Sequence, residues 1–411
     1  MQEKNIKSLS FGCRLNALEC EKIKNIITPH VDAAVIVNTC SVTAEAERQS
    51  AQAVRKIARE NPNVPIFVTG CGSTRNPDLF AKIPNTVVIP NTQKMDKNQY
   101  VSGLAQLNTN GEIIKFVHES PELSKQFIQI QNGCNHKCTY CVTRLLRGPA
   151  VSYPYSDILA DARAAVARGF YEIVITGVDS ASYAFNMGDK FIFISDVCKM
   201  LLRDVPEIQR LRISSLDPAS PEIFKIIDLI HTEPRMMPHL HLSMQSGSDT
   251  ILSAMARRHN ADLVRKIVAA ADGITFSWDI ICGFPGETDE LFNETCDLVA
   301  EVKPIKIHAF PFSPRPGTVG ATLPNQVNHN ISKQRVHQIT ELANKNMAEY
   351  MATQIGTTIS VLVENNNIAR TPDDIDVIIH GDKIPAKTIC DIEIIDIKND
   401  KFIGKRKCYE K

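Results

Sequence analysis

The sequence predicts an α/β chain with three successive parts: an open parallel sheet, a partial (β/α)6 barrel and a small β-barrel. Three observations support this prediction. Apolar strand-like runs alternate with helical patterns through roughly the first hundred residues, which indicates βαβ units. Six more strand–helix repeats begin at Gln126, and alternating β-type runs occupy Thr357–Lys411.

The first part contains short apolar runs that are typical of buried strands, separated by helical patterns. The strand-like runs are Ser8–Phe11, Ala33–Val37 and Ile66–Val68, and the helical patterns are Asn16–Ile27 and Thr43–Arg59. Because parallel strands need crossover connections, this alternation predicts a parallel sheet. The polar stretch Asn91–Glu122 is expected to link this sheet to the second part.

A cysteine follows each of these three strands: Cys13, Cys40 and Cys71. In open α/β sheets, ligands bind outside the carboxyl ends of the strands, so these cysteines are expected at one functional edge. Cysteine is also a small residue that packs well at strand ends, and packing is the better explanation for any single one. Three cysteines at the same topological position favour a shared site, because burial alone does not require that coincidence.

The second part repeats a strand and a helix six times. The strand-like runs are Phe127–Gln131, Glu172–Thr176, Arg210–Ser214, His239–Met244, Ser277–Cys282 and Lys306–Phe312. The helical patterns are Ser156–Arg168, Phe191–Arg203, Glu222–Ile230, Asp249–Ala271 and Asp289–Val302. Six repeats fit a partial (β/α)6 barrel better than an eight-stranded one, and the chemistry of such barrels lies at the C-terminal ends of the strands.

The most informative motif follows the first strand of this barrel and reads Cys134-Asn-His-Lys-Cys138-Thr-Tyr-Cys141. The Cx3Cx2C spacing supplies three thiolates from one loop, and cysteine thiolates are the usual ligands of 4Fe-4S clusters. Three ligands leave one iron open to a small molecule. The alternative is a structural zinc site, which needs four closed ligands. His136 lies too close in the sequence to its neighbouring cysteines to complete a tetrahedron easily.

The third part follows a loop and a long helix. The segment Pro314–Asn330 is rich in Pro, Gly and Asn, as loops are, and a helical pattern covers Ile331–Met351. β-type runs then occur at Ile359–Val363, Asp376–His380 and Ile392–Asp396. The segment is long enough for a small barrel of five strands.

Composition limits the location and class of the protein. The chain has 411 residues, with 46 basic and 46 acidic side chains, which is enough for two or three domains. The charge balance neither indicates nor excludes a nucleic-acid partner, because patches decide binding. The N-terminus shows no signal region and no long apolar run follows, so we expect a cytoplasmic protein without membrane contact, where thiols stay reduced. The remaining cysteines, which we interpret as packing or surface residues, are Cys20, Cys198, Cys282, Cys296, Cys390 and Cys408.

Several strings around these features resemble the radical-SAM methylthiotransferase family over essentially the whole chain. They are Gly12-Cys-Arg-Leu-Asn16, Asn38-Thr-Cys-Ser-Val-Thr43, Thr69-Gly-Cys71, His239-Leu-His-Leu-Ser-Met-Gln-Ser-Gly247, Asp279-Ile-Ile-Cys-Gly-Phe-Pro-Gly-Glu-Thr288 and Ser313-Pro-Arg-Pro-Gly-Thr318. The resemblance implies a flavodoxin-like N-terminal domain at 1–118, a radical S-adenosylmethionine (SAM) domain at 119–352, and a divergent TRAM-like β-barrel at 353–411.

The resemblance also implies the chemistry. The Cx3Cx2C cysteines would hold a 4Fe-4S cluster whose open iron binds SAM, and the three strand-end cysteines would hold a second 4Fe-4S cluster that carries the sulfur to be transferred. One SAM would methylate that sulfur, and another would supply the hydrogen-abstracting 5′-deoxyadenosyl radical. A radical route suits the reaction, because an unactivated aromatic C–H bond is too weakly acidic for a side-chain base.

Within the family, Arg14 and the Ser-Val-Thr sequence after Cys40 resemble the MtaB-type branch. That branch methylthiolates C2 of N6-threonylcarbamoyladenosine at position 37 of tRNA. The alternative substrates are isopentenyladenosine at the same tRNA position and a ribosomal protein. A further alternative is a non-catalytic iron–sulfur or zinc protein that binds RNA. The expected partners of the enzyme are tRNA, an electron donor of the flavodoxin or ferredoxin type, and a sulfur source.

Residues at the ends of the barrel strands are candidates for binding SAM. They are Gly177, Val178, Ser214, Ser215, Gln245, Asp279 and Gly283. The first two match the place where the family's backbone receives the methionine amino group. Serine hydroxyls can reach a carboxylate or a ribose, and a glycine lets the backbone approach an adenine closely. Turns and helix caps explain the same residue types equally well.

Basic residues are the candidates for RNA contacts. They are Arg144, Arg147, Arg257, Arg258, Lys405, Arg406 and Lys407. Arginine can grip a phosphate through two hydrogen bonds, and basic clusters attract the phosphate backbone. For the two arginines just beyond the Cx3Cx2C loop, a solvated salt bridge is an equal alternative.

Overall fold

A computed structural model of the chain describes residues 5–105, 124–365 and 367–407. These residues divide into two compact units, the first within 1–122, 132–150 and 313–321, and the second within 123–131, 151–312 and 322–411. The domain boundary expected at 118/119 lies outside the described residues, so the three predicted domain ranges stay predictions. Within the described ranges, no helix combines the length and the apolar character that crossing a membrane requires.

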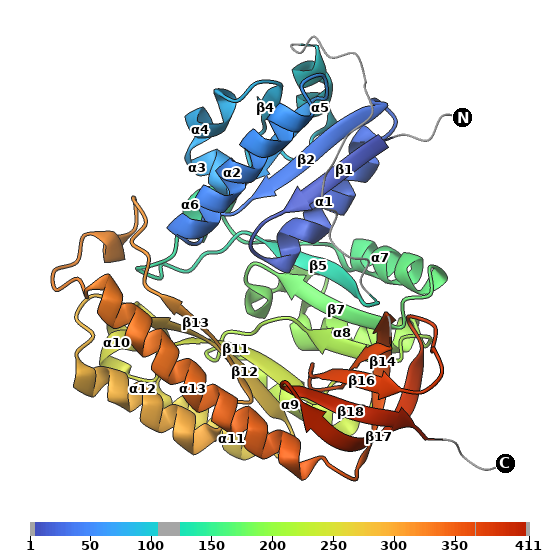
Figure 1. The fold of residues 1–411 in the computed structure, drawn as a ribbon, viewed down its shortest axis with the longest axis vertical. Coiled ribbons are helices and arrows are strands. Elements are labelled where there is room, and N and C mark those ends of the chain that lie inside the picture. Colours follow the sequence, from blue (N-terminus) through green and yellow to red (C-terminus); the bar gives the residue numbers. More distant parts are fainter. Residues whose placement is uncertain (1–4, 106–123, 366, 408–411) are drawn as a thin grey trace. The chain divides into compact units, whose positions relative to one another are not determined.

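A four-stranded parallel sheet forms the centre of the first unit (Figure 1). Its strands follow chain order: β1 (Asn5–Ser10), β2 (Ala33–Thr39), β3 (Ile66–Gly70) and β4 (Thr86–Val88). The helices of this unit are α1 (Arg14–Ile27), α2 (Ala44–Glu60), α3 (Cys71–Arg75), α4 (Pro77–Ala81), α5 (Lys97–Leu104) and α6 (Thr143–Arg147), with the 3-10 turn η2 (Val319–Ala321). The predicted open parallel sheet is confirmed.

Both faces of this sheet are covered, because β2 and β3 are buried along their whole length. On one face, α1 and α5 pack on Ile36 and Phe67, and the ring of Tyr100 meets that of Phe67 edge-on at 5.1 Å. On the other face, α2 packs on Val35 and Val37. The expectation that 91–122 is a linker is therefore wrong at α5. The helix is polar apart from a few residues, and burial of Tyr100 against the sheet holds it in place.

The second unit contains six parallel strands that run in chain order. They are β5 (Gln126–Asn132), β7 (Glu172–Gly177), β10 (Arg210–Ile213), β11 (His239–Gln245), β12 (Thr275–Cys282) and β13 (Lys306–Pro311), and the short β6 (Val151–Ser152) borders β5. Parallel ladders join the first three and the last three, and isolated bridges join β10 to the β11 side. The partial (β/α)6 barrel is confirmed.

Helices cover the outside of this half-barrel, and their apolar sides form its main core. They are α7 (Tyr155–Ala167), α8 (Ile194–Asp204), α9 (Ile223–Thr232), α10 (Asp249–Ala254), α11 (Ala261–Ala270), α12 (Asp289–Val302) and α13 (His329–Thr353), with the 3-10 turn η1 (Ser180–Ser182). In Figure 1, α13 runs along the outside of the β11–β13 strands.

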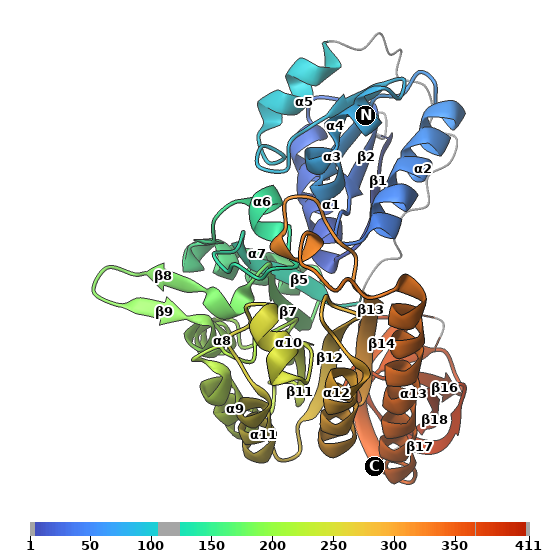
Figure 2. The same cartoon turned by 90° about the vertical axis from the view of Figure 1, so that its left-hand side faces the viewer.

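Two local expectations in this unit are wrong. The single helix expected at 249–271 is two helices, since Ala256 adopts a left-handed φ of 55° and the Asn260 side chain caps α11 by accepting a hydrogen bond from Leu263 N. The start of the helix expected at Phe191 is instead strand β9 (Phe191–Phe193), which pairs with β8 (Ala184–Asn186). Figure 2 shows this hairpin projecting from the half-barrel.

The last segment is a closed five-stranded barrel, as expected. Its strands are β14 (Thr358–Asn365), β15 (Ile368–Arg370), β16 (Asp376–His380), β17 (Ile389–Lys398) and β18 (Lys401–Arg406). Inward-facing aliphatic side chains and Phe402 fill it. The closed ladder leaves no free sheet edge within the barrel. Of the cysteines interpreted as packing residues, Cys390 lies in β17, and Cys408 lies outside the described residues.

A buried ionic network joins this small barrel to the start of the half-barrel strands. Glu172, 1% exposed, pairs with Arg210 and Arg212 at 3.3 Å each. Both arginines also reach across to the small barrel, where Arg210 donates to the Ser360 carbonyl at 2.6 Å and Arg212 to the Pro372 carbonyl at 2.8 Å. One carboxylate thus holds two cations that bind the backbone of the small barrel.

Lys125 adds a parallel link, because its ammonium pairs with Asp374 at 2.8 Å. Burial alone would raise the pKa of Glu172, but Arg212, Lys125 and Arg210 outweigh burial and hold the pKa below its ordinary value. The Glu172 carboxylate is therefore ionised at neutral pH. Lys125, Arg210 and Arg212 all pair with carboxylates inside the second unit. These pairs pack the small barrel against the half-barrel within that unit.

We expect Glu172→Gln to lower the free energy of unfolding by about 3–5 kcal/mol, because it leaves two buried guanidinium groups without their carboxylate. Urea denaturation at neutral pH measures the loss. A matched control is Glu301→Gln, which breaks an exposed pair with Arg265 and should have little effect. Equal losses for the two variants would contradict the role assigned to Glu172.

Candidate metal centre

The three strand-end cysteines meet at one edge of the first sheet. Cys13 directly precedes α1, Cys40 follows β2, and Cys71 is the first residue of α3 after β3. β1, β2 and β3 are parallel neighbours, so their carboxyl ends lie together. Cys13 and Cys71 each interact electrostatically with Cys40, and Cys71 interacts with Cys13. Cys13 is exposed, whereas Cys40 and Cys71 are buried.

A glycine makes this convergence possible at Cys13. Gly12 has a φ of 82°, in the region that L side chains rarely adopt. A Cβ atom built on it would lie 2.4 Å from the Cys40 sulfur. Any side chain at position 12 would therefore displace Cys40, which explains why the Gly-Cys pair in this motif is a structural requirement for gathering the sulfurs.

Polar side chains tie the three cysteine loops to one another. Asn16 Nδ2 donates to the Phe11 carbonyl at 2.8 Å and to the Thr39 carbonyl at 3.3 Å, and so joins the loops of Cys13 and Cys40. Thr39 Oγ1 donates to the Thr69 carbonyl at 2.7 Å and accepts from Ser73 N at 2.9 Å. The second tie joins the loops of Cys40 and Cys71. Asn16 and Thr39 are both buried, so these hydrogen bonds hold the three loops together in the protein interior.

The Cx3Cx2C loop has its own internal order. Cys134 N donates to the Gly148 carbonyl at 3.2 Å, and Cys141 N donates to the Cys138 carbonyl at 3.1 Å. The three cysteines of this loop are partly exposed. The loop belongs to the same compact unit as the strand-end cysteines.

Direct packing joins the two sets of cysteines. Cys71 forms a small buried apolar cluster with Val142 and Leu146, which lie immediately beyond Cys141. The segment 313–321 contacts both sets of loops. Arg315 Nη2 donates to Ser41 Oγ at 3.0 Å, beside Cys40, and Gly320 N donates to the Thr139 carbonyl at 2.7 Å, within the Cx3Cx2C loop.

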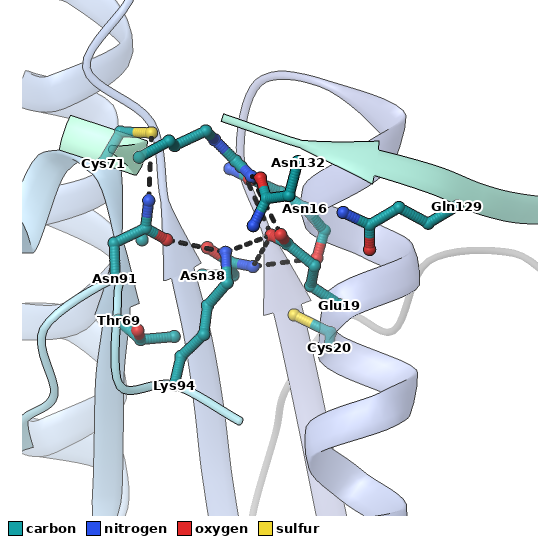
Figure 3. A network of polar contacts seen from close by, with 12 residues as sticks. Asn16, Glu19, Cys20, Asn38, Thr69, Cys71, Asn91, Lys94, Gln129 and Asn132 are labelled. Atoms are coloured by element: carbon teal, nitrogen blue, oxygen red, sulfur yellow. Dashed lines mark hydrogen bonds and ion pairs between the residues drawn. The ribbon is translucent and has the colours of Figure 1, made fainter. Parts of the chain in front are cut away.

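Beneath these loops lies a buried ionic network, drawn in Figure 3. The Glu19 carboxylate, fully buried in α1, pairs with Lys94 at 2.5 Å and with Arg147 at 2.9 Å. Asn38 Nδ2 donates a further bond to Glu19 at 3.2 Å. Arg147 also donates to Asn16 Oδ1 at 2.7 Å. Glu19 thus joins α1 to the helix that follows the Cx3Cx2C loop.

Burial and the neighbouring charges have opposite effects on the pKa values of Glu19 and Lys94. Burial would raise the pKa of Glu19, but Lys94 and Arg147 hold it below its ordinary value. Burial lowers the pKa of Lys94, against the attraction of Glu19. Burial raises the pKa of the Cys40 thiol to about 11. A metal that binds Cys40 must therefore displace a proton, as metals generally do at thiols.

The sulfur environments fit a cluster bound by thiolates. Sulfurs of both sets of cysteines accept a backbone N–H from the residue two positions on: Val42 N to Cys40 at 3.5 Å, His136 N to Cys134 at 3.4 Å, and Thr143 N to Cys141 at 3.4 Å. Such donors favour the thiolate form, and hydrogen bonds to sulfur are a known influence on cluster potentials.

The residues expected to bind SAM lie at the carboxyl ends of strands in the second unit. Gly177 ends β7, Gln245 ends β11, and Ser214 and Ser215 follow β10. Ser214 donates to Thr176 Oγ1 at 3.1 Å, and Ser215 shares a hydrogen bond of 3.0 Å with Ser243. These residues therefore share one edge of the half-barrel, with Val178 directly after Gly177. Whether they contact SAM stays a prediction.

Gln245 has an unusual backbone. Its φ of 71° places a non-glycine residue in the left-handed region, which costs of order 1–3 kcal/mol and is common at functional sites. The β11 ladder is irregular at this point. Glycine or asparagine usually occupies such a backbone conformation. The presence of glutamine at this position therefore favours a functional role for its side chain.

Asp279 and Gly283 have internal partners. Asp279 Oδ2 lies 3.1 Å from His241 Nε2 within the half-barrel. Gly283 N donates to Glu287 Oε2 at 2.6 Å, and a Cβ on Gly283 would lie 1.9 Å from Ser332 Oγ. Close packing against Ser332 of α13 is thus sufficient to explain this glycine, and its approach to an adenine stays a prediction.

The expected RNA-binding residues divide by burial. The side chains of Arg147 and Arg257 are buried in ion pairs, with Glu19 at 2.9 Å and with Asp217 at 3.3 Å. This burial does not favour an RNA contact for either residue, and their role stays a prediction. Arg258 is half-exposed and pairs with the same aspartate at 2.9 Å. The exposed members are Arg144, Lys405, Arg406 and Lys407, where Lys405 pairs with Glu393 at 3.4 Å.

Sequence reasoning missed the residues that hold the cysteine loops together, above all Glu19, Lys94, Asn91 and Arg315. One signal was available: Glu19 is a charged residue on the buried face of α1, between Leu18 and the buried Cys20. Charged residues are almost never fully buried unless paired. Lys94 and Asn91 lie in the polar stretch Asn91–Glu122, where no periodicity identifies a buried residue.

Comparison with known proteins agrees with this arrangement. Residues 128–299 match the Radical SAM superfamily, and residues 5–90 match the uncharacterized protein family UPF0004. The first match covers most of the half-barrel together with the Cx3Cx2C loop. The second covers the sheet that carries Cys13, Cys40 and Cys71.

Relatives match along nearly the whole chain. The threonylcarbamoyladenosine tRNA methylthiotransferase MtaB of Rickettsia prowazekii is 38% identical over 88% of this chain and 88% of the relative. The MtaB protein of Chlamydia pneumoniae is 33% identical over 87% of this chain and 86% of the relative. The tRNA-2-methylthio-N(6)-dimethylallyladenosine synthase of Neisseria gonorrhoeae is 32% identical over 86% and 87%.

Among solved structures, the radical SAM methyltransferase TsrM of Kitasatospora setae, with cobalamin and a 4Fe-4S cluster bound, has a TM-score of 0.55. It is 13% identical and covers 77% of each chain. At this identity the likeness shows the fold alone.

We expect Glu19→Gln to lower the free energy of unfolding by about 3–5 kcal/mol at neutral pH, because Lys94 and Arg147 lose their shared buried carboxylate. The difference from the wild-type protein should stay constant above the ordinary glutamate pKa of 4.5. It should shrink as the pH falls through the lowered folded-state pKa, because protonation removes the charge that glutamine lacks. Urea denaturation at a series of pH values measures both effects.

Glu45→Gln is the control, since Glu45 forms an exposed pair with Arg48 and its loss should matter little. A loss in Glu19→Gln no larger than in this control, or one that does not depend on pH, would refute the buried ionic network.

Proposed function

Because the chain belongs to the family of MtaB-type radical-SAM methylthiotransferases, we propose that it converts N6-threonylcarbamoyladenosine at position 37 of tRNA to the 2-methylthio derivative. We further propose that it uses two 4Fe-4S clusters, and SAM both as methyl donor and as radical source. The enzyme class and the use of iron–sulfur chemistry and SAM follow from the family. The substrate and the number of clusters are proposals for this chain.

The observation that carries the proposal is the gathering of two sets of three cysteines in one compact unit. Cys71, from the strand-end set, packs on Val142, the residue after Cys141 of the Cx3Cx2C set. A sulfur transfer needs its sulfur source close to the group that initiates the reaction. A single structural cluster or an electron carrier gives no reason for a second set of cysteines against the first.

The chain's own residues position and order the reacting groups. When bound, the clusters and SAM supply the radical and methyl-transfer chemistry that side chains lack. Cys134, Cys138 and Cys141 would hold one cluster, and the strand-end cysteines would hold the other. Asn16 and Thr39 keep the strand-end loops in register through buried hydrogen bonds. Backbone donors at the sulfurs favour the ionised ligands.

The SAM contacts are proposed at the strand ends of the half-barrel. Gly177 and Val178 offer backbone groups there, and Ser214 and Ser215 offer hydroxyls. The strained backbone of Gln245 supports its place in this group. Asp279 stays a proposed contact, with His241 as its partner at 3.1 Å.

The choice of N6-threonylcarbamoyladenosine rests on sequence similarity. The first MtaB relative is 38% identical, against 32% for the dimethylallyladenosine synthase. The motif Gly12-Cys13-Arg14 and the Ser-Val-Thr after Cys40 favour the same substrate. The isopentenyladenosine and ribosomal-protein alternatives are therefore less favoured, and a non-catalytic zinc or iron–sulfur RNA-binding protein is not favoured by the family.

Partners of the proposed enzyme follow from the chemistry. It needs tRNA, an electron donor of the flavodoxin or ferredoxin type and a source of sulfur, in the cytoplasm where thiols are reduced. Arg144, Arg258, Lys405, Arg406 and Lys407 are the proposed RNA contacts. Asp374 of the small barrel pairs with Lys125, which lies next to β5. The RNA contacts that we propose for the small barrel are its exposed residues Lys405, Arg406 and Lys407.

Two single substitutions should separate the roles of the two sets of cysteines. We expect Cys134→Ala to abolish formation of 5′-deoxyadenosine from SAM, since it removes a ligand of the cluster that would bind SAM. We expect Cys40→Ala to keep that activity but to give no methylthio product. Anaerobic assays with tRNA, with chromatographic analysis of both products, measure the two outcomes.

Cys198→Ala is the control, because Cys198 is buried in the apolar core of the half-barrel. It should keep both products. Retention of the methylthio product in Cys40→Ala would exclude a catalytic role for the strand-end set.

The substrate is tested by expressing the protein in a bacterium that lacks its own methylthiotransferases and analysing tRNA nucleosides by mass spectrometry. We expect a new 2-methylthio derivative of N6-threonylcarbamoyladenosine, with isopentenyladenosine unchanged. A methylthio mark on isopentenyladenosine alone would overturn the substrate proposal and leave the enzyme class intact.

A further inference from the structure

Asn91 contacts both sets of cysteine loops. It follows β4, is 5% exposed, and lies in no helix or strand. Its amide nitrogen Nδ2 lies 3.9 Å from the Cys71 sulfur (Figure 3). The same nitrogen donates to the Leu146 carbonyl at 3.0 Å. Leu146 lies in α6, directly after the Cx3Cx2C loop. One side chain therefore links a strand-end cysteine to the segment that follows Cys141.

Lys94 determines which way this amide points. The Lys94 ammonium donates to Asn91 Oδ1 at 2.6 Å. An amide turned the other way would place its NH2 group against the ammonium, donor against donor, and would lose the bond to Leu146 as well. The hydrogen-bond network thus assigns Nδ2 to the side of Cys71.

Lys94 is itself held by the buried network beneath the loops. It is 2% exposed and pairs with Glu19 at 2.5 Å. Glu19 also pairs with Arg147 at 2.9 Å, so one carboxylate faces two cations and the network has one positive charge in excess. Both cations interact electrostatically with Cys71. The Cys71 sulfur therefore lies beside an oriented N–H donor with a buried positive charge behind it.

We propose that Asn91, oriented by Lys94, is a positioning residue that hydrogen-bonds the Cys71 thiolate and raises the reduction potential of the cluster at Cys13, Cys40 and Cys71, the N-terminal cluster. The inference rests on the proposed function, because it takes Cys71 as a cluster ligand. It deepens that function by assigning control of the N-terminal cluster to two residues that are not ligands.

The direction of the effect follows from charge. One-electron reduction adds one negative charge to the cluster and its thiolates. An N–H donor and a buried excess of positive charge stabilise the reduced form more than the oxidised form, and hydrogen bonds to the sulfurs and net charge are established influences on cluster potentials. Removing the donor therefore makes the N-terminal cluster harder to reduce.

The N-terminal cluster can be studied alone in the full-length Cys134→Ala/Cys138→Ala/Cys141→Ala protein, reconstituted anaerobically with iron and sulfide. Iron content and the visible spectrum report the cluster. Titration with dithionite as the one-electron donor, followed by paramagnetic resonance, gives its potential. Asn91→Leu removes the amide, Asn91→Asp replaces the donor with a negative oxygen, and Lys94→Met removes the orienting charge.

We expect all three variants to shift the potential to more negative values, with the largest shift in Asn91→Asp. For Asn91→Leu we expect about a tenfold lower ratio of reduced to oxidised cluster at a fixed potential, which is a shift of about 59 mV for one electron. Loss of iron from an Asn91 variant, with iron retained in the control below, would also support the proposal, because it shows that Asn91 positions a ligand.

Asn61→Leu is the matched control. Asn61 is a buried asparagine of the same unit, 3% exposed, that donates to the Ile57 carbonyl at 3.0 Å at the far end of α2. We expect Asn61→Leu to lower the stability of the protein without moving the potential of the cluster. Full iron content with an unchanged potential in all three variants would overturn the proposal.

The same protein distinguishes failure of the proposed second cluster from failure of the role of Asn91 and Lys94. If the triple-alanine protein binds no iron–sulfur cluster, the proposed second cluster fails. If it binds a cluster whose reduction potential is the same with and without the Asn91 and Lys94 substitutions, the proposed function stands and only the role of these two residues is lost.

Discussion

The candidate centre depends on one buried carboxylate. Glu19 pairs with Lys94 and Arg147 and accepts a bond from Asn38. Through these partners it connects α1, β2, the segment after β4 and the helix that follows the Cx3Cx2C loop. A buried charge is costly unless it is paired and hydrogen-bonded, so each of these elements must stay in place for the others to be stable. Glu19 therefore holds together four separate segments that pack beneath the cysteine loops.

This support explains why the Cx3Cx2C loop belongs to the compact unit of the N-terminal sheet, although the strand before it belongs to the half-barrel. Arg147, Asn91 and the apolar contact of Cys71 with Val142 all act on the segment that follows the loop. Residues that contact the strand-end cysteines therefore also contact the segment that follows the Cx3Cx2C loop. The small C-terminal barrel is built into the second unit by the same principle, with Glu172 as its shared carboxylate.

Much of the fold follows from sequence periodicity. The sequence predicts all six half-barrel strands and three of the four N-terminal strands within a few residues, because their apolar runs are bounded by clear breaks. The short strand β4 is not predicted. The prediction failed at α5, at the break between α10 and α11, and at the β8–β9 hairpin. In each case local sequence is compatible with more than one state. Burial of Tyr100, the capping of α11 by Asn260 and the pairing of Phe191 with Asn186 decide between them.

The kind of chemistry can be predicted from the sequence, because three cysteines in a Cx3Cx2C loop and three more at equivalent strand ends favour metal ligation. The residues that surround these cysteines become apparent from tertiary contacts. Arg147 and Arg257 are basic, as RNA contacts usually are, but both are buried in ion pairs. Asn91, in contrast, lies in a polar stretch and contacts Cys71, and Lys94 binds Asn91. The residues that can bind a metal are recognised from their type and spacing in the sequence. The surroundings of those residues depend on ion pairs between segments that are distant in the sequence, and no local pattern predicts such pairs.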